Sequence, residues 1–252
     1  MTRELLISAA GLGLSSLLGS ILGLIIRRIP HSWNDVLLGF CAGMMLTASI
    51  VCLIMPAIEM STMAQWWQIA VGITLGVILI GLIDKITPHL HHISGIEEPE
   101  RHTTSVASLN RTLLFVTAIA LHKLPEGLAT GISFNGDTNN AIAVTITIAL
   151  QNIPEGMVVV TPLLMVGVRF INTALIAVTI ALIEVIGMFV GYFIGDISAL
   201  FLPVMLAIAG GAMLYVISDE MIPETHAHGY QKYATYALVA GVFLMLLIET
   251  SV

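Results

Sequence analysis

Long apolar segments, separated by short polar breaks, constrain this chain more than any other feature. Each segment is long enough to cross the hydrocarbon core of a bilayer, which takes about 20 apolar residues. Only 10% of all residues are charged, against about 25% in a soluble domain. We therefore predict an all-α membrane protein with eight transmembrane helices in a single domain, residues 1–252. The segments span residues 4–26, 35–59, 66–86, 112–133, 140–165, 170–194, 198–221 and 233–250.

Basic residues indicate how these helices are oriented, because Lys and Arg collect in cytoplasmic loops. With the N-terminus outside, seven of the 9 Lys and Arg residues fall on the cytoplasmic side: Arg27, Arg28, Lys85, Arg101, Arg111, Arg169 and Lys232. We predict a multi-pass protein of the cell (inner) membrane, with both termini extracytoplasmic and the loop 87–111 in the cytoplasm. The net charge of −7 argues against a nucleic-acid partner.

Two sequence echoes predict internal repeats. Segment 112–133 carries Ala-Leu-His-Lys-Leu-Pro-Glu-Gly, and segment 140–165 carries Ala-Leu-Gln-Asn-Ile-Pro-Glu-Gly. One helix and one loop separate the two copies, so they run antiparallel. A weaker echo is the spacing of thirteen residues from Gly43 to Pro56 and from Gly210 to Pro223. We expect inverted repeats that relate helices one to three to helices six to eight, and helix four to helix five. Secondary transporters with a site near the midplane are built in this way.

Ionisable side chains at membrane depth point to a metal site. His122 and Glu126 lie four residues apart on one helix face, and Gln151 and Glu155 repeat this pair. Glu184 adds a further carboxylate in helix six. A charge buried in lipid costs at least about 2.5 kcal/mol unless it has a partner, so these carboxylates should converge. The mixed nitrogen and oxygen donors suit Zn²⁺, Fe²⁺ or Mn²⁺. A structural polar network or a proton relay is the alternative.

The two Pro-Glu-Gly motifs resemble the paired signatures of the ZIP (Zrt/Irt-like) metal transporters, most closely the bacterial GufA type. The stretch 219–226, Asp-Glu-Met-Ile-Pro-Glu-Thr-His, resembles the same family. The resemblance implies the ZIP fold, a homodimer and a two-metal centre. It also implies that helices one, four, five and six move against the others like an elevator. The ligands implied for the first metal are His122, Glu126, Gln151 and Glu155, and residues 123, 152 and 184 would contribute to a second site.

The chain departs from the family pattern at this second site. Lys123 stands where the family usually has Asn, and Asn152 stands where an acidic residue can occur. A lysine ammonium has no lone pair for a metal and repels a dication. We hypothesise that Lys123 takes the second-metal position as a tethered cation, balanced by Glu126, Glu155 or Glu184, so that the centre is mononuclear. Alternatively, Lys123 points away and only neutralises the cluster.

Polar residues near the helix ends are candidates for a metal route. On the predicted outer side, Glu59 ends helix two and Glu249 ends helix eight. Such acidic residues would concentrate cations at an entrance. The exit candidates, on the predicted cytoplasmic side, are Glu220, Glu224, His226, His228 and the loop histidines His89, His91 and His92. For both groups, ordinary solvated or interfacial positions are the alternative.

Taken together, these patterns predict a secondary carrier that moves a divalent transition metal into the cytoplasm. Zn²⁺ is the expected substrate, with Cd²⁺, Fe²⁺ and Mn²⁺ as alternatives. The expected partners are this metal ion, the lipid bilayer and a second copy of the chain. A metal-selective channel is the first alternative function. An intramembrane metallohydrolase is a weaker one, because the chain lacks His-Glu-x-x-His. We therefore expect no enzymatic activity.

Overall fold

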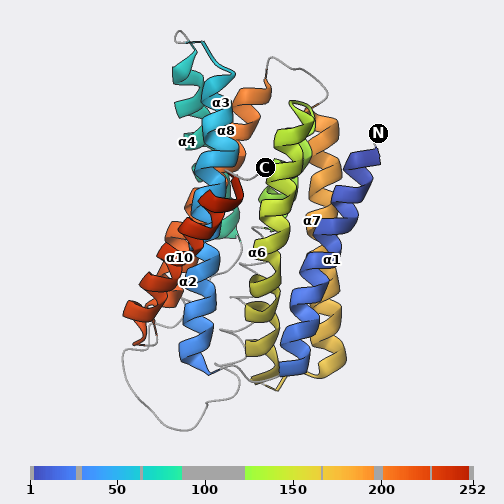
Figure 1. Ribbon diagram of the computed structural model, residues 1–252, viewed down its shortest axis with the longest axis vertical. Coiled ribbons are helices and arrows are strands. Elements are labelled where there is room, and N and C mark those ends of the chain that lie inside the picture. Colours follow the sequence, from blue (N-terminus) through green and yellow to red (C-terminus); the bar gives the residue numbers. More distant parts are fainter. Residues whose placement is uncertain are drawn as a thin grey trace.

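The computed structural model describes residues 3–26, 30–62, 65–86, 123–165, 167–195, 201–227 and 229–249. Within these ranges the regular elements are all helical, and Figure 1 shows them as a bundle along one long axis. They are α1 (Arg3–Ile26), α2 (His31–Thr47), η1 (Ala48–Ile54), α3 (Met55–Glu59), α4 (Trp66–Ile86), α6 (Thr138–Met165), α7 (Phe170–Gly195), α8 (Leu202–Val216), η2 (Ile217–Met221), α9 (Ile222–Thr225) and α10 (Gln231–Glu249). Residues 123–133 form a further helix.

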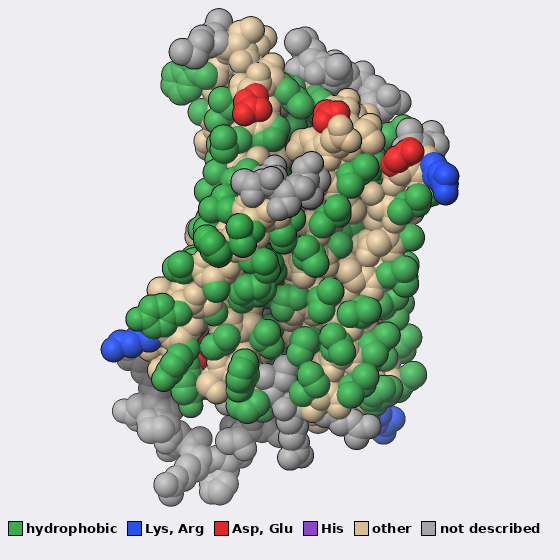
Figure 2. All heavy atoms as spheres, viewed as in Figure 1, with side chains coloured by type: hydrophobic (Ala, Val, Ile, Leu, Met, Phe, Trp, Pro, Cys, Tyr) green, Lys and Arg blue, Asp and Glu red, His purple; other side chains and the backbone are tan. Residues whose placement is uncertain are grey.

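The bundle has the composition of a membrane protein. Within the described ranges, 6 helical stretches are long and apolar enough to cross a membrane, and Trp66–Leu82 in α4 is a shorter apolar helix. Large apolar side chains such as Leu14, Ile78 and Phe243 are exposed. Figure 2 shows apolar side chains over the middle of one face and charged ones gathered towards its ends. The predicted all-α membrane fold is confirmed.

The predicted segments can be compared with the observed helices. Five segments, 4–26, 66–86, 140–165, 170–194 and 233–250, match α1, α4, α6, α7 and α10 to within two residues at each end. Segment 35–59 corresponds to α2, η1 and α3 together, although α2 already begins at His31. Segment 112–133 is described only from Lys123 onwards, so the count of eight helices stays a prediction. The loop 87–111 lies outside the described residues.

Two helices change to π-helical geometry just before a proline. The π-helix η1 follows α2 and precedes Pro56, and η2 follows α8 and precedes Pro223. A proline has no N–H and its ring clashes with the carbonyl four residues earlier, which a wider π turn can accommodate. The helix therefore continues past Pro223 to Thr225, beyond the end predicted at residue 221. Both prolines of the weaker sequence echo, Pro56 and Pro223, thus follow a π-helical turn.

The described helices pack in two groups. α1 lies along α6 and α7, whereas α10 lies along α2 and α4 lies along α8. The two groups meet where α2 and η1 contact α6. This division agrees with the helices that the family resemblance assigns to the moving and the fixed parts of an elevator. The motion itself, and the inverted repeat, remain predictions.

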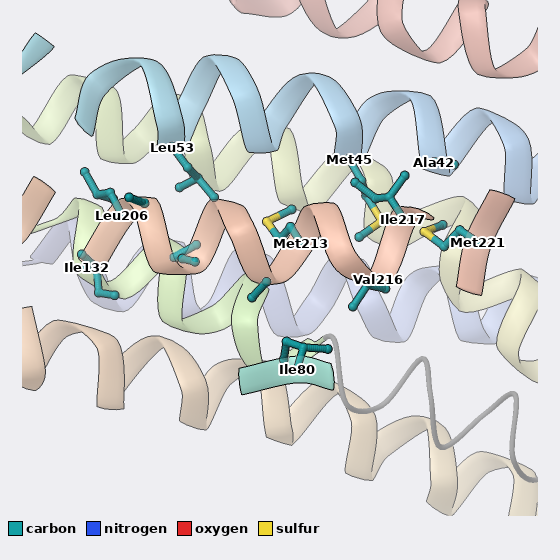
Figure 3. Close-up of a cluster of buried hydrophobic side chains, with 14 of the residues drawn as sticks. Ala42, Met45, Leu53, Ile80, Ile132, Leu206, Met213, Val216, Ile217 and Met221 are labelled. Atoms are coloured by element: carbon teal, nitrogen blue, oxygen red, sulfur yellow. The ribbon is translucent and has the colours of Figure 1, made fainter. Parts of the chain in front are cut away.

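An apolar core joins α2 and η1 to α8 and to the 123–133 helix. Figure 3 shows Leu53 and Leu206 towards one end of this core, Met45 and Ile217 towards the other, and Met213 between them. All five side chains are buried. In lipid, close van der Waals packing of this kind is a main source of helix association.

Candidate metal site

Six polar side chains meet in the interior of the bundle, and each is at most 2% exposed. They come from the 123–133 helix, α6 and α7, and they include both Pro-Glu-Gly glutamates. The six are Lys123, Glu126, Gln151, Asn152, Glu155 and Glu184. Sequence analysis selected every one of them as a site residue. The seventh predicted member, His122, lies outside the described residues.

The glycine of each motif allows a neighbouring helix to come close. A Cβ added at Gly127 would lie 2.1 Å from the backbone oxygen of Glu184 in α7. A Cβ added at Gly156 would lie 2.7 Å from the backbone nitrogen of Ser20 in α1. Only glycine permits such contacts, which bring α7 and α1 against the two motif helices. The side chains of α1 and α7 can therefore reach the cluster.

The ammonium group of Lys123 lies between the two motif glutamates. Its Nζ is 2.6 Å from Oε2 of Glu126 and 2.6 Å from Oε2 of Glu155. It also donates a hydrogen bond to Oδ1 of Asn152. These three acceptors can use all three N–H bonds of the ammonium group. The lysine therefore points into the cluster and joins the 123–133 helix to α6.

Gln151 presents an oxygen that a cation could use. Its Nε2 donates to Oε1 of Glu126 at 2.8 Å, which fixes the orientation of the amide. Its Oε1 is buried and accepts no hydrogen bond from the described part of the chain. A buried acceptor without a partner costs about 1–3 kcal/mol. The lone pairs of this oxygen are thus available to a bound ion.

Glu184 is connected to Lys123 through Asn152. Nδ2 of Asn152 donates to Oε1 of Glu184 at 2.7 Å and makes a longer contact of 3.3 Å with Oγ of Ser15. Oγ of Ser16 donates to Oε2 of Glu184 at 2.6 Å. Sequence analysis did not select Ser15 or Ser16. The available signal was a group of serines, at 15, 16 and 20, on an otherwise apolar helix.

The donor set of the described residues is made of oxygens. Glu126, Glu155 and Gln151 supply carboxylate and amide oxygens, and the predicted nitrogen donor is His122. Among the described residues, no group of three His, Cys, Asp or Glu side chains could hold a metal ion. A complete metal site therefore needs the Gln151 oxygen, or a residue beyond the described ones, besides the two glutamates.

The predicted exit residues lie at the end of the α8–η2–α9 stretch. Glu220 and Glu224 are half-buried, and His226 is exposed. Nδ1 of His226 lies 2.7 Å from the carbonyl oxygen of Ile222. Because a carbonyl only accepts, Nδ1 must donate in this contact, which leaves the lone pair of a neutral imidazole on Nε2. The remaining exit candidates, His228, His89, His91 and His92, lie outside the described residues.

The predicted entrance residue Glu59 lines a hollow of about 450 Å³, together with Asp137 and Asn140. Asp137 was not predicted. Gln151 follows Asn140 by eleven residues on α6, which is about 16 Å along the axis. Val144 and Ile148, both buried, lie between these positions on α6. The hollow therefore lies about three helical turns from the polar cluster. Glu249 is the last residue of α10, and its side chain lies outside the described part.

Comparison with known proteins extends these observations. The family model described as ZIP zinc transporter matches residues 87–249, which include both Pro-Glu-Gly motifs and Glu184. The chain belongs to the ZIP family. The predicted family resemblance is confirmed.

Individual ZIP proteins cover most of the chain. The chain is 40% identical to zinc transporter ZIPB of Bordetella bronchiseptica, over 96% of this chain and 79% of that protein. It is 35% identical to zinc transporter GufA of Myxococcus xanthus, over 73% of this chain and 71% of that protein. It is 30% identical to zinc transporter ZupT of Streptococcus mutans, over 92% of this chain and 91% of that protein.

Proposed function

We propose that this protein is a secondary carrier that moves Zn²⁺ across the membrane into the cytoplasm. The observation that carries the proposal is the buried cluster in which Lys123 pairs with Glu126 and Glu155 of the two Pro-Glu-Gly motifs. Family membership and the three relatives named as zinc transporters support the choice of zinc. Cd²⁺, Fe²⁺ and Mn²⁺ are the alternative substrates, because such donor sets discriminate poorly between divalent ions.

The proposed ligands of the transported ion are His122, Glu126, Gln151 and Glu155. The unpaired Oε1 of Gln151 supports this set, since it is the kind of buried acceptor that a cation would satisfy. To reach the two glutamates, the ion must weaken their contacts with Lys123. The ion then replaces its water shell with protein oxygen and nitrogen atoms.

The centre is proposed to hold one metal ion. Lys123 occupies the position of a second metal, in contact with both glutamates. Three carboxylates (Glu126, Glu155 and Glu184) and one ammonium group (Lys123) leave two negative charges in the cluster. One dication neutralises them, whereas two would leave two uncompensated positive charges in a buried site, which is costly.

The route and the assembly extend the proposal. Ions enter from the extracytoplasmic side near Glu59, Asp137 and Glu249, where acidic residues raise their local concentration. They leave on the cytoplasmic side past Glu220, Glu224 and His226, whose Nε2 offers a lone pair. Both termini are extracytoplasmic, the protein lies in the cell membrane, and two copies form a dimer. The helix group of α1, α6 and α7 moves together with the 123–133 helix.

Metal uptake into proteoliposomes tests this function. Wild type should take up Zn²⁺ with saturation, and Cd²⁺, Fe²⁺ and Mn²⁺ measured in parallel rank the substrates. Glu126→Gln removes one proposed ligand charge and should abolish uptake. Glu4→Gln, an exposed carboxylate on α1, is the matched control and should transport like wild type. Uptake that never saturates would favour a channel, and no uptake by inserted wild type would overturn the proposal.

A further inference from the structure

We propose that Glu184 is a positioning residue in this chain. Ser16 holds Glu184, and Glu184 in turn orients Asn152 so that the amide oxygen faces Lys123. The inference rests on the proposed function only in taking Lys123 as the tethered cation of the second site. It assigns to Glu184 a role other than that of a metal ligand, and it adds Ser16 of α1 to the centre.

Both carboxylate oxygens of Glu184 are already engaged. Oε1 accepts from Asn152 at 2.7 Å and Oε2 accepts from Ser16 at 2.6 Å. The side chain is 0% exposed, and hydrogen bonds to a charged carboxylate are short and strong. A metal at Glu184 would have to share an oxygen with one of these hydrogen bonds, and it would lie close to the Lys123 ammonium group, which repels a dication.

The asparagine amide transmits the effect of Glu184 to Lys123. An amide has an acceptor on one side and a donor on the other. Because Nδ2 of Asn152 donates to Glu184, its Oδ1 is turned towards the ammonium group of Lys123. The reversed amide would place its oxygen against the Glu184 carboxylate, which cannot donate, and its N–H groups against the ammonium group, which cannot accept. Glu184 thus determines which end of Asn152 the lysine meets.

The backbone of α1 is close enough to make this arrangement rigid. A Cβ added at Gly19 would lie 2.8 Å from the backbone oxygen of Asn152 itself. Ser16 lies one turn before Gly19 on the same helix, and it is 5% exposed. The hydroxyl of Ser16 therefore reaches Glu184 from a backbone that is fixed against α6.

The space beside Lys123 also speaks against a second ion. A cavity of about 10 Å³ lies there, lined by Ser16, Ser20, Lys123, Asn152 and Glu155 among others. This volume is at the lower limit for a single water molecule. A second ion that keeps water molecules as ligands therefore has no room beside Lys123.

NMR of lysine ammonium groups labelled with ¹⁵N directly tests the connection from Ser16 through Glu184 and Asn152 to Lys123. The chain contains three lysines, Lys85, Lys123 and Lys232, so the variant Lys85→Arg/Lys232→Arg retains a single signal, that of Lys123. In this background, Ser16→Ala should shift the signal and raise the exchange rate of its protons about tenfold, although the Ser16 hydroxyl bonds to Glu184 and not to Lys123. Ser20→Ala is the matched control, because within the described ranges its hydroxyl donates to the backbone oxygen of Ser16 and to no member of the cluster. It should leave the signal unchanged.

Metal stoichiometry provides the second measurement. Glu184→Gln should still bind one Zn²⁺ per chain, and its Lys123 signal should change as it does in Ser16→Ala. An unchanged signal in Ser16→Ala, or equal effects of Ser16→Ala and Ser20→Ala, would overturn the proposal. Loss of one bound Zn²⁺ per chain in Glu184→Gln would also overturn it, because Glu184 would then be a ligand. If Glu184→Gln does not fold, Ser16→Ala alone decides. If the protein takes up no zinc but the Lys123 signal still changes in Ser16→Ala, the proposed function is refuted and this inference stands.

Discussion

Nζ of Lys123 lies 2.6 Å from Oε2 of Glu155, a residue 32 positions later in a different helix. The same ammonium group lies equally close to Glu126, so a single cation links the two Pro-Glu-Gly motifs. An unpaired carboxylate at this depth would cost at least about 2.5 kcal/mol. The lysine thus compensates the charge of both carboxylates, as a bound metal ion would, and it stays attached to the protein throughout transport.

Replacing Gln151 by Leu should raise the KM for Zn²⁺ uptake by about tenfold or more. The change removes a proposed ligand oxygen and the hydrogen bond to Glu126, and a hydrogen bond to a charged group contributes about 1.5–3 kcal/mol. Thr147→Val is the matched control, one turn earlier on α6. Thr147 is equally buried, and its hydroxyl accepts or donates no hydrogen bond within the described residues. Equal KM values for the two variants would show that Gln151 does not bind the ion.

Gly127→Ala should lower the thermal stability and the uptake of the purified protein. The new Cβ would lie 2.1 Å from the backbone oxygen of Glu184, and overpacking of this kind costs about 1–3 kcal/mol. At Gly11 a new Cβ meets nothing within 4 Å, so Gly11→Ala should be neutral or stabilising by up to about 1 kcal/mol. Unfolding followed by fluorescence in detergent measures both variants. A Gly127→Ala protein as stable as Gly11→Ala would contradict the close contact between α7 and the motif helix.

Removing the negative charges of Glu59 and Asp137, which line the hollow at the predicted outer end, should affect zinc capture more than turnover. The double variant Glu59→Gln/Asp137→Asn should raise the KM about two- to fivefold at low ionic strength and leave kcat unchanged. The difference should vanish at high salt, because salt screens exposed charges. Glu4→Gln controls for general charge loss, since α1 begins at the same end of the bundle (Figure 1). A salt-independent effect would mean that the two carboxylates act in another way.

The helices were predictable because their breaks are chemically distinct. Polar and glycine-rich stretches such as Asn135-Gly136-Asp137 separate apolar runs, and α4 and α6 begin and end within two residues of the predicted positions. The end of the α8–η2–α9 stretch was less predictable. Pro223 indicates a helix end, but the preceding π turn accommodates the proline ring and the helix continues to Thr225. Such a turn depends on neighbouring packing and has no clear sequence signal.

The members of the buried polar cluster were predictable where they form a motif, and their role as metal ligands stays a prediction. Glu126, Gln151, Glu155 and Glu184 were identifiable because carboxylates and amides are rare at membrane depth. Ser16 was not, because a serine fits many apolar helices, and its partner Glu184 lies 168 residues away. Asp137 also escaped notice, since it lies in a polar turn where acidic residues are common. Only the packing of α1 against α7 brings Ser16 to Glu184, and only the packing of α3 near the start of α6 brings Asp137 to the hollow beside Glu59.

The number of zinc ions bound per chain tests most directly whether Lys123 replaces a second metal. Purified wild type, loaded to saturation and analysed for metal and protein content, should contain one Zn²⁺ per chain. Lys123→Asn, which restores the residue usual in the family, should contain two, and Lys123→Arg, which keeps the charge, should contain one. Two ions in the wild type, or one ion in both wild type and Lys123→Asn, would contradict the tethered-cation hypothesis.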